Sequence, residues 1–132
     1  MNEIIRLSPQ EAWDALQSDA NAILLDVRAT LEFAFVGHPV GAVHVPWKEW
    51  PTWQINPAFI ETVRQLVPDT STPIFLLCRS GQRSLDAANA LRESGYSKLS
   101  NIEEGFEGPL SADKHRGTLG GWRFHGLPWE QS

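Results

Sequence analysis

The sequence predicts an α/β domain built around a mainly parallel β-sheet. Three apolar runs, at 22–25, 73–77 and 99–102, have the continuous hydrophobic character of strands that are covered on both faces. Segments with helical spacing and helix-capping residues lie between these runs. Strands that alternate with helices favour a parallel sheet, because each helix serves as the crossover between two strands.

Cap residues mark where the helices begin. Ser8 and Glu11 form a capping box with a proline between them, and an apolar face follows. Asn56, followed by proline, predicts a second start, and an apolar stripe continues to Pro68, which ends that helix. A third helix is predicted at 84–94, where a glycine closes it.

The remaining predicted elements are short. Strands are predicted at 4–7 and 42–45, and a helical turn is predicted at 30–35. Glycine and proline punctuate 37–42, so this stretch is expected to be irregular. These short elements add edges and connections to the predicted sheet.

Composition favours a soluble globular chain, and a length of 132 residues predicts one domain spanning 1–132. Hydrophobic residues make up 42% of the chain and charged residues 20%, as expected for such a domain. The formal net charge of −5 argues against nucleic acid as a partner, because nucleic-acid binding requires a basic surface. Apolar runs stay well short of the roughly 20 residues that cross a bilayer, so no membrane association is expected.

Both ends of the chain and its single cysteine add further expectations. The N-terminus lacks a basic region followed by a long apolar stretch, so a secretory signal is not expected. One cysteine cannot form an internal disulfide, which favours the reducing cytoplasm as the location. The C-terminal part, 106–132, contains glycine and aromatic residues and is predicted to pack on the domain as an extension.

The cysteine, Cys78, follows the strand-like run at 73–77 and precedes a short polar loop and a helix. Loop N–H groups and the positive end of a helix both stabilise a thiolate. Arg79 and Arg83 add positive charge, and arginine at a helix N-terminus is unfavourable unless an anion binds there. A buried, inert thiol is the alternative, but a loop of Arg, Ser, Gly and Gln does not pack as core. The pattern therefore predicts a nucleophilic thiol beside an anion site.

Other polar and aromatic residues have mainly structural interpretations. Asp26 and Arg28 lie at a strand end, where a salt bridge is favoured, with Arg28 bonded to Glu32 one helical turn away. Three tryptophans fall at helical spacing, which predicts core packing: Trp47, Trp50 and Trp53. A ring that follows a strand end can also wall a pocket, and Trp47 is the candidate. The histidines lack the spacing of a zinc site and only one thiolate is available, so no metal is expected.

Several short motifs occur in an order that resembles the rhodanese family of sulfurtransferases. They are Asp26-Val27-Arg28, Glu32-Phe33, the stretch 37–46, Cys78-Arg79-Ser80-Gly81-Gln82-Arg83-Ser84, Glu104-Gly105 and Gly126-Leu127-Pro128. Each motif is weak by itself, but together they cover most of the chain. The resemblance implies the rhodanese fold, a five-stranded mostly parallel sheet with helices on both faces.

The resemblance also implies a sulfurtransferase whose nucleophile is Cys78. The thiolate takes a sulfane sulfur from a small anionic donor, thiosulfate in the family's standard assay, and becomes a persulfide. A thiophilic acceptor then removes the sulfur, and no cofactor is implied. The residues that cradle the sulfur are Arg79, Ser80, Gly81, Gln82, Arg83 and Ser84. Asp26, Arg28 and Glu32 are expected to support them.

Two features depart from the family pattern. Glu32 occupies a position at which thiosulfate-specific two-domain members carry arginine, which argues against thiosulfate as the natural donor. The segment 106–121 looks longer than in compact members and contains Lys114, His115 and Arg116. This segment can cover the site, with His115 and Arg116 as candidate pocket residues, or recognise a protein partner.

Two other functions compete with the small-molecule enzyme. Cysteine phosphatases and arsenate reductases use the pattern C-x5-R, whereas Arg83 gives C-x4-R and Ser84 stands at the next position. The shorter loop suits one sulfur atom better than a phosphoryl group. The second alternative is a persulfide carrier or regulatory module that delivers sulfur to a protein acceptor, with little turnover of small acceptors. Carrier and enzyme share the persulfide on Cys78, so both stay open.

Overall fold

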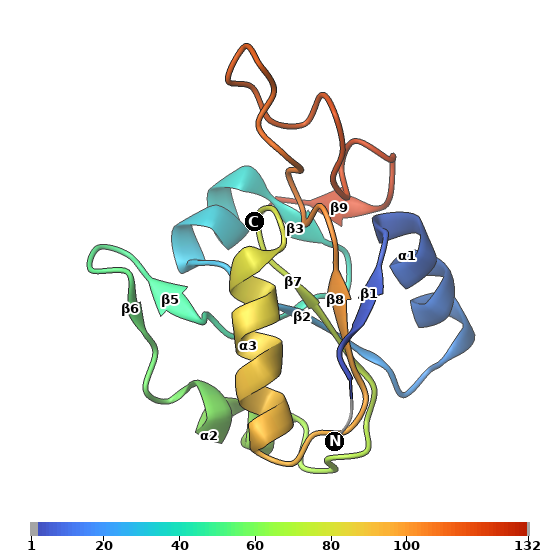
Figure 1. Cartoon of the computed structure of the whole chain (residues 1–132), viewed down its shortest axis with the longest axis vertical. Helices are drawn as coiled ribbons and strands as arrows, with labels where there is room; N and C mark the ends of the chain where they lie inside the picture. Colours follow the sequence, from blue (N-terminus) through green and yellow to red (C-terminus); the bar gives the residue numbers. More distant parts are fainter. Residues whose placement is uncertain (1–2, 132) are drawn as a thin grey trace.

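The computed structural model of the chain describes residues 3–131. Its centre is a five-stranded sheet with the order β1-β8-β7-β2-β4, in which every pairing is parallel (Figure 1). The strands are β1 (Ile5–Leu7), β2 (Ile23–Asp26), β4 (Val43–His44), β7 (Ile74–Leu77) and β8 (Leu99–Ile102). The predicted α/β class and parallel sheet are confirmed, and the carboxyl end of β7 lies in the middle of the sheet.

Helices cover both faces of this sheet, which explains why its strands are apolar without alternation. Helix α1 (Pro9–Ser18) packs on one face, where Ala12 joins a buried cluster with Leu24, Phe75 and Leu77. Helices α2 (Phe59–Leu66) and α3 (Gln82–Glu93) pack on the opposite face of the sheet. Helix α3 crosses the front of the sheet in Figure 1. The core residues on that face include Leu25, Val63, Ile74, Leu76, Ala87 and Leu91.

Local hydrogen bonds explain where the helices begin. The hydroxyl of Ser8 accepts from the Glu11 N–H at 3.1 Å, and the Glu11 carboxylate accepts from the Ser8 N–H at 2.9 Å, so the predicted capping box forms. The side chain of Asn56 instead accepts from the Ala58 N–H at 3.0 Å. That bond closes a turn before the helix, and α2 therefore begins at Phe59, later than predicted. Helix α3 begins at Gln82, earlier than predicted.

Two small antiparallel sheets were not predicted. Strand β3 (His38–Pro39) pairs with β9 (Trp129–Glu130), and β5 (Lys48–Glu49) pairs with β6 (Gln54–Ile55) in a hairpin. The core packing predicted from the tryptophan spacing is therefore wrong for two of the three rings. Trp47 is buried before the hairpin, whereas the rings at its tip are largely exposed: Trp50 and Trp53. The helical turn predicted at 30–35 is a short π-helix, η1 (Glu32–Val36).

One of the contacts that attach the C-terminal segment to the domain is a buried tryptophan. Trp122 is fully buried and packs edge-to-face on Trp13 of α1, with ring centroids 5.9 Å apart. Its indole N–H donates to the carbonyl of Pro128 at 2.8 Å, just before β9. Between β8 and this anchor the chain forms a loop that projects beyond the sheet (Figure 1). Within residues 3–131, the structure has no helix with the length and apolar character needed to cross a membrane.

Candidate active site

Cys78 lies directly after β7, at the carboxyl end of the central strand. In open α/β sheets this edge is where ligands bind. The residue is 1% exposed and belongs to the core cluster on the face that α3 covers, so the thiol is buried. Burial favours an inert thiol unless polar groups face the sulfur, and the loop supplies such groups.

A tight loop connects the cysteine to the N-terminus of α3. Gly81 is the N-cap of α3 and has φ +116°, a conformation that residues with a side chain rarely adopt. This conformation turns the Gly81 N–H toward the cysteine, and it donates to Sγ at 3.1 Å. The hydroxyl of Ser84, in the first turn of α3, lies 3.3 Å from the same sulfur. The sulfur thus accepts from an amide at the positive end of a helix, which favours negative charge on sulfur, and the Ser84 hydroxyl lies beside it.

The chain after β8 holds this loop from the other side. The N–H of Phe106 donates to the carbonyl of Cys78 at 2.8 Å, and the N–H of Glu107 donates to the carbonyl of Arg79 at 3.0 Å. A Cβ on Gly105 would lie only 2.5 Å from the Cys78 carbonyl oxygen, so the two segments touch backbone to backbone. These bonds keep the loop carbonyl groups engaged with 106–108 and fix the loop conformation.

The guanidinium of Arg83 is paired with Glu32 of η1. Two hydrogen bonds of 2.7 and 2.9 Å join their side chains, which are 17% and 16% exposed. Burial raises the pKa of Glu32, but the hydrogen bonds and charge of Arg83 outweigh it and hold that pKa below its ordinary value. Burial likewise lowers the pKa of Arg83, and the carboxylate of Glu32 reverses the direction, so that pKa is raised. Arg83 is therefore locally neutralised and gives little net charge to a bound anion.

Arg28 does not pair with Glu32 as predicted, because the carboxylate of Asp26 holds it. The guanidinium donates to Asp26 at 2.7–3.2 Å and to the carbonyl of Gly37 at 2.6 Å, and both charged side chains are fully buried. The Arg28 guanidinium also lies over the ring of Phe106, 4.4 Å from its centroid. This pair joins the end of β2, the end of η1 and the C-terminal segment, as a structural salt bridge does.

A cavity of about 410 Å³ opens beside the loop. The side chains that line it are Glu32, Lys48, Trp53, Arg79 and Arg83. After Arg83 is paired with Glu32, two cations are left. Within residues 3–131, the side chains of Lys48 and Arg79 have no hydrogen-bond or ion-pair partner. The cavity is therefore suited to an anion that approaches beside an indole ring.

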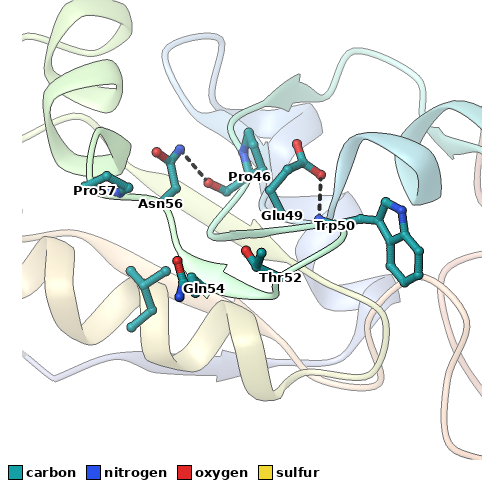
Figure 2. A pocket seen from close by; sticks show the side chains of 8 residues that line it. Pro46, Glu49, Trp50, Thr52, Gln54, Asn56 and Pro57 are labelled. Carbon is teal, nitrogen blue, oxygen red and sulfur yellow. Dashed lines mark hydrogen bonds between the residues drawn. The ribbon is translucent and has the colours of Figure 1, made fainter.

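Sequence reasoning missed two of these lining residues, Lys48 and Trp53. Both come from the β5–β6 hairpin, whose strands are two residues long and carry no readable alternation. Figure 2 shows a second pocket along the same hairpin, lined by Pro46, Glu49, Trp50, Thr52, Gln54, Ile55, Asn56 and Pro57. Its one ionisable group, Glu49, already accepts from the backbone and hydroxyl of Thr30 at 2.8 and 2.6 Å. We therefore take the cavity beside the Cys78 loop as the candidate site.

The remaining predicted residues lie outside that cavity. Gln82 is exposed and donates to Asp86 at 3.1 Å, and Ser80 is also exposed. Trp47 packs edge-to-face on Phe59 in the core and does not line the cavity, contrary to the prediction for it. Trp53 lines the cavity instead. The two candidates of the projecting segment are bonded within that segment: His115 through its N–H to Ser111, and Arg116 to the Gly108 carbonyl.

The cysteine lies at the end of the central parallel strand, next to the N-terminus of the following helix. This arrangement is typical of α/β domains that carry one thiol in a loop suited to anions. Residues 8–112 match the family described as the Rhodanese-like domain. The chain therefore belongs to the rhodanese-like family, as the sequence motifs predicted.

Individual proteins match over most of their length. The thiosulfate sulfurtransferase GlpE of Haemophilus influenzae is 32% identical over 107 residues, covering 81% of this chain and 89% of that protein. The uncharacterized protein RC0915 of Rickettsia conorii is 40% identical over 124 residues, covering 91% and 92%. The crystal structure of Rv0390 from M. tuberculosis superposes with a TM-score of 0.87 at 38% identity, covering 96% and 97%. These matches support a sulfurtransferase-type domain.

Proposed function

We propose that the chain is a sulfurtransferase that carries a sulfane sulfur on Cys78. The observation that carries this proposal is the position of the sulfur: it accepts from the Gly81 N–H at 3.1 Å beside a cavity with two unpaired cations. The amide and the helix N-terminus stabilise the thiolate and the persulfide, while Lys48 and Arg79 attract an anionic donor. The likeness to a thiosulfate sulfurtransferase supports the same chemistry.

The reaction consists of two nucleophilic displacements at sulfur. The Cys78 thiolate attacks the outer sulfur of thiosulfate, the donor S–S bond breaks, and sulfite leaves with the bonding electron pair. An acceptor such as cyanide then attacks the outer sulfur of the persulfide, and the electron pair of that S–S bond returns to Cys78. No net redox change occurs in the protein, and no general base is needed when the thiolate is already formed.

Intact-mass spectrometry after incubation with thiosulfate tests the covalent step directly. We expect a gain of one sulfur, about 32 Da per chain, which cyanide reverses. The variant Cys78→Ser should keep its fold and gain no mass. No gain with either thiosulfate or 3-mercaptopyruvate, or a gain in Cys78→Ser, would contradict the proposal.

The exposed rings beside the cavity favour a second candidate, a carrier that hands sulfur to a protein. Trp53 lines the cavity and is 41% exposed, and it pairs edge-to-face with Trp50, which is 56% exposed. Exposed aromatic side chains are enriched at protein interfaces. Repeated turnover of thiosulfate with cyanide supports the enzyme, whereas a persulfide that forms once and survives small acceptors supports the carrier.

A further inference from the structure

A chain of buried polar side chains runs from the catalytic sulfur across the end of the sheet. The hydroxyl of Ser84, 3.3 Å from the sulfur, lies 2.5 Å from the side-chain oxygen of Asn101 in β8. The side-chain nitrogen of Asn101 lies 2.6 Å from the carboxylate of Glu103 and 3.1 Å from the carbonyl of Gly81. Ser84 is 0% and Asn101 1% exposed, so these groups must satisfy one another.

Donor and acceptor counting fixes the direction of each bond. The Gly81 carbonyl and the Glu103 carboxylate only accept, so the NH2 group of Asn101 must face them and its oxygen must face Ser84. A serine hydroxyl has one hydrogen to donate. The Gly81 carbonyl also lies 3.2 Å from that hydroxyl, but it already receives hydrogens from Asn101 and from the Leu85 N–H at 3.3 Å. Within residues 3–131, the Asn101 oxygen has only the Ser84 hydroxyl as a donor, so the hydrogen of Ser84 points to Asn101.

It follows that Ser84 presents a lone pair, and not a hydrogen, to the sulfur of Cys78. A thiol can donate its S–H to that lone pair, whereas a thiolate gains nothing from it. For Ser84 to donate to the thiolate, its hydrogen must leave Asn101, whose buried oxygen then has no partner. Gly81 favours the thiolate through its N–H, and the Ser84–Asn101 pair opposes it.

We propose that Asn101 is a positioning residue that holds the Ser84 hydroxyl as an acceptor for the Cys78 thiol and so sets the pH at which the nucleophile forms. The inference rests on the proposed function, since it concerns the nucleophile of that reaction. Glu103 anchors the amide of Asn101 and is itself held by Arg6, whose Nε lies 3.4 Å from its other oxygen. The polar chain thus connects the sulfur to a half-exposed ion pair at the edge of the sheet.

Other charged groups surround the sulfur as well. They are Arg79 in the loop, Arg83 on α3, Glu32 on η1, Asp26 and Arg28 at the end of β2, and Glu103 after β8. The test variants below leave all of them unchanged. A difference between variants therefore reports on the Ser84–Asn101 pair.

The test measures the rate of Cys78 alkylation by iodoacetamide against pH, which follows the thiolate without any sulfur transfer. In Ser84→Ala the thiol loses its acceptor, so we expect the midpoint to move to lower pH by about 0.5–1 unit, the size of one hydrogen bond. A midpoint that stays or moves to higher pH overturns the inference. Ser100→Ala is a matched control, because it also changes a buried serine to alanine but lies on β8. It should leave the midpoint unchanged.

A double-mutant cycle separates positioning from structural damage. In Asn101→Leu, the Ser84 hydrogen can turn to the thiolate, which is a stronger acceptor than the neutral Gly81 carbonyl 3.2 Å away, so the midpoint should fall, whereas the same change made in Ser84→Ala should have no effect. An equal shift in both backgrounds overturns the inference. If Asn101→Leu does not fold, as shown by circular dichroism, the direction of the Ser84→Ala shift decides. Mass gain with thiosulfate, measured separately on the same proteins, tests the proposed function independently.

Discussion

Replacing Gly105 by alanine tests whether the C-terminal segment holds the loop that follows Cys78. Gly105 has φ +64°, and a Cβ there would lie 2.5 Å from the Cys78 carbonyl oxygen and 2.6 Å from the Arg79 carbonyl group. Backbone atoms cannot rotate away, so the loop or the segment has to move. Gly126→Ala is a matched control, because Gly126 has φ +73° with no atom within 4 Å of the place that an added methyl group would occupy.

The control isolates the conformational cost, which is about 1–2 kcal/mol for an L-residue in the left-handed region. Overpacking adds about 1–3 kcal/mol at Gly105, so the total loss in the free energy of unfolding there is about 2–5 kcal/mol. A domain of this size has about 5–15 kcal/mol of stability, so most Gly105→Ala chains remain folded. A shift of about 1 Å in the loop can lower a reaction rate by about 100-fold.

Urea unfolding measures the stability of both variants, and the rate of mass gain with thiosulfate measures loop function. We expect Gly105→Ala to form the persulfide about 100-fold more slowly than Gly126→Ala, with the larger loss of stability. Equal rates in the two variants would refute the reasoning, because the loop would then not depend on its contact with Gly105.

Predictions for three further variants concern the charges and the helix cap. Glu32→Gln should lower the KM for thiosulfate in steady-state assays, since it releases the charge of Arg83; an unchanged or higher KM would oppose this account. Because the pKa of Glu32 is lowered in the folded protein, its contribution to stability is present above its ordinary pKa and is lost as pH falls through the folded value. Urea unfolding should therefore show a smaller loss of stability toward pH 3 in Glu32→Gln than in the unchanged protein. Arg79→Ala should raise the thiosulfate KM with little effect on the cyanide step, and an unaltered KM would leave donor binding to the backbone and Lys48. Ser8→Ala removes the α1 cap and should cost about 1 kcal/mol in urea unfolding, with sulfur transfer unchanged.

The parallel sheet could be predicted because its signals are local. Each buried strand is an apolar run, and the α1 capping box lies within four consecutive residues. The hairpin of β5 and β6 gave no such signal, since two-residue strands are too short to show alternation, and the tryptophan spacing predicted core packing of rings that the hairpin exposes. The start of α2 was misplaced because Asn56 can close a turn as well as cap a helix.

The candidate site was predicted only where its residues are neighbours in the sequence. Cys78 and the loop after it form one motif, whereas Glu32 and Arg83 are 51 positions apart and meet only in the fold. The carboxylate of Asp26 also accepts from the Arg28 backbone N–H at 3.1 Å, and this bond holds it beside the Arg28 side chain. A prediction from helical spacing does not consider such a backbone bond. Asn101 was missed although a signal exists: it is an amide in a fully buried strand that pairs with the strand preceding the cysteine.

The geometry separates the two tasks that a sulfur-carrying site must perform. A buried sulfur anion is costly unless polar groups face it, and the Gly81 amide at the helix N-terminus supplies that stabilisation. Arg83 adds little net charge near the sulfur, because Glu32 neutralises it. The cations with unpaired side chains, Lys48 and Arg79, lie instead in the cavity wall, where the proposed function has them attract the donor. We therefore expect charge changes at Arg79 to alter donor binding and changes around Ser84 to alter the reactivity of the thiol.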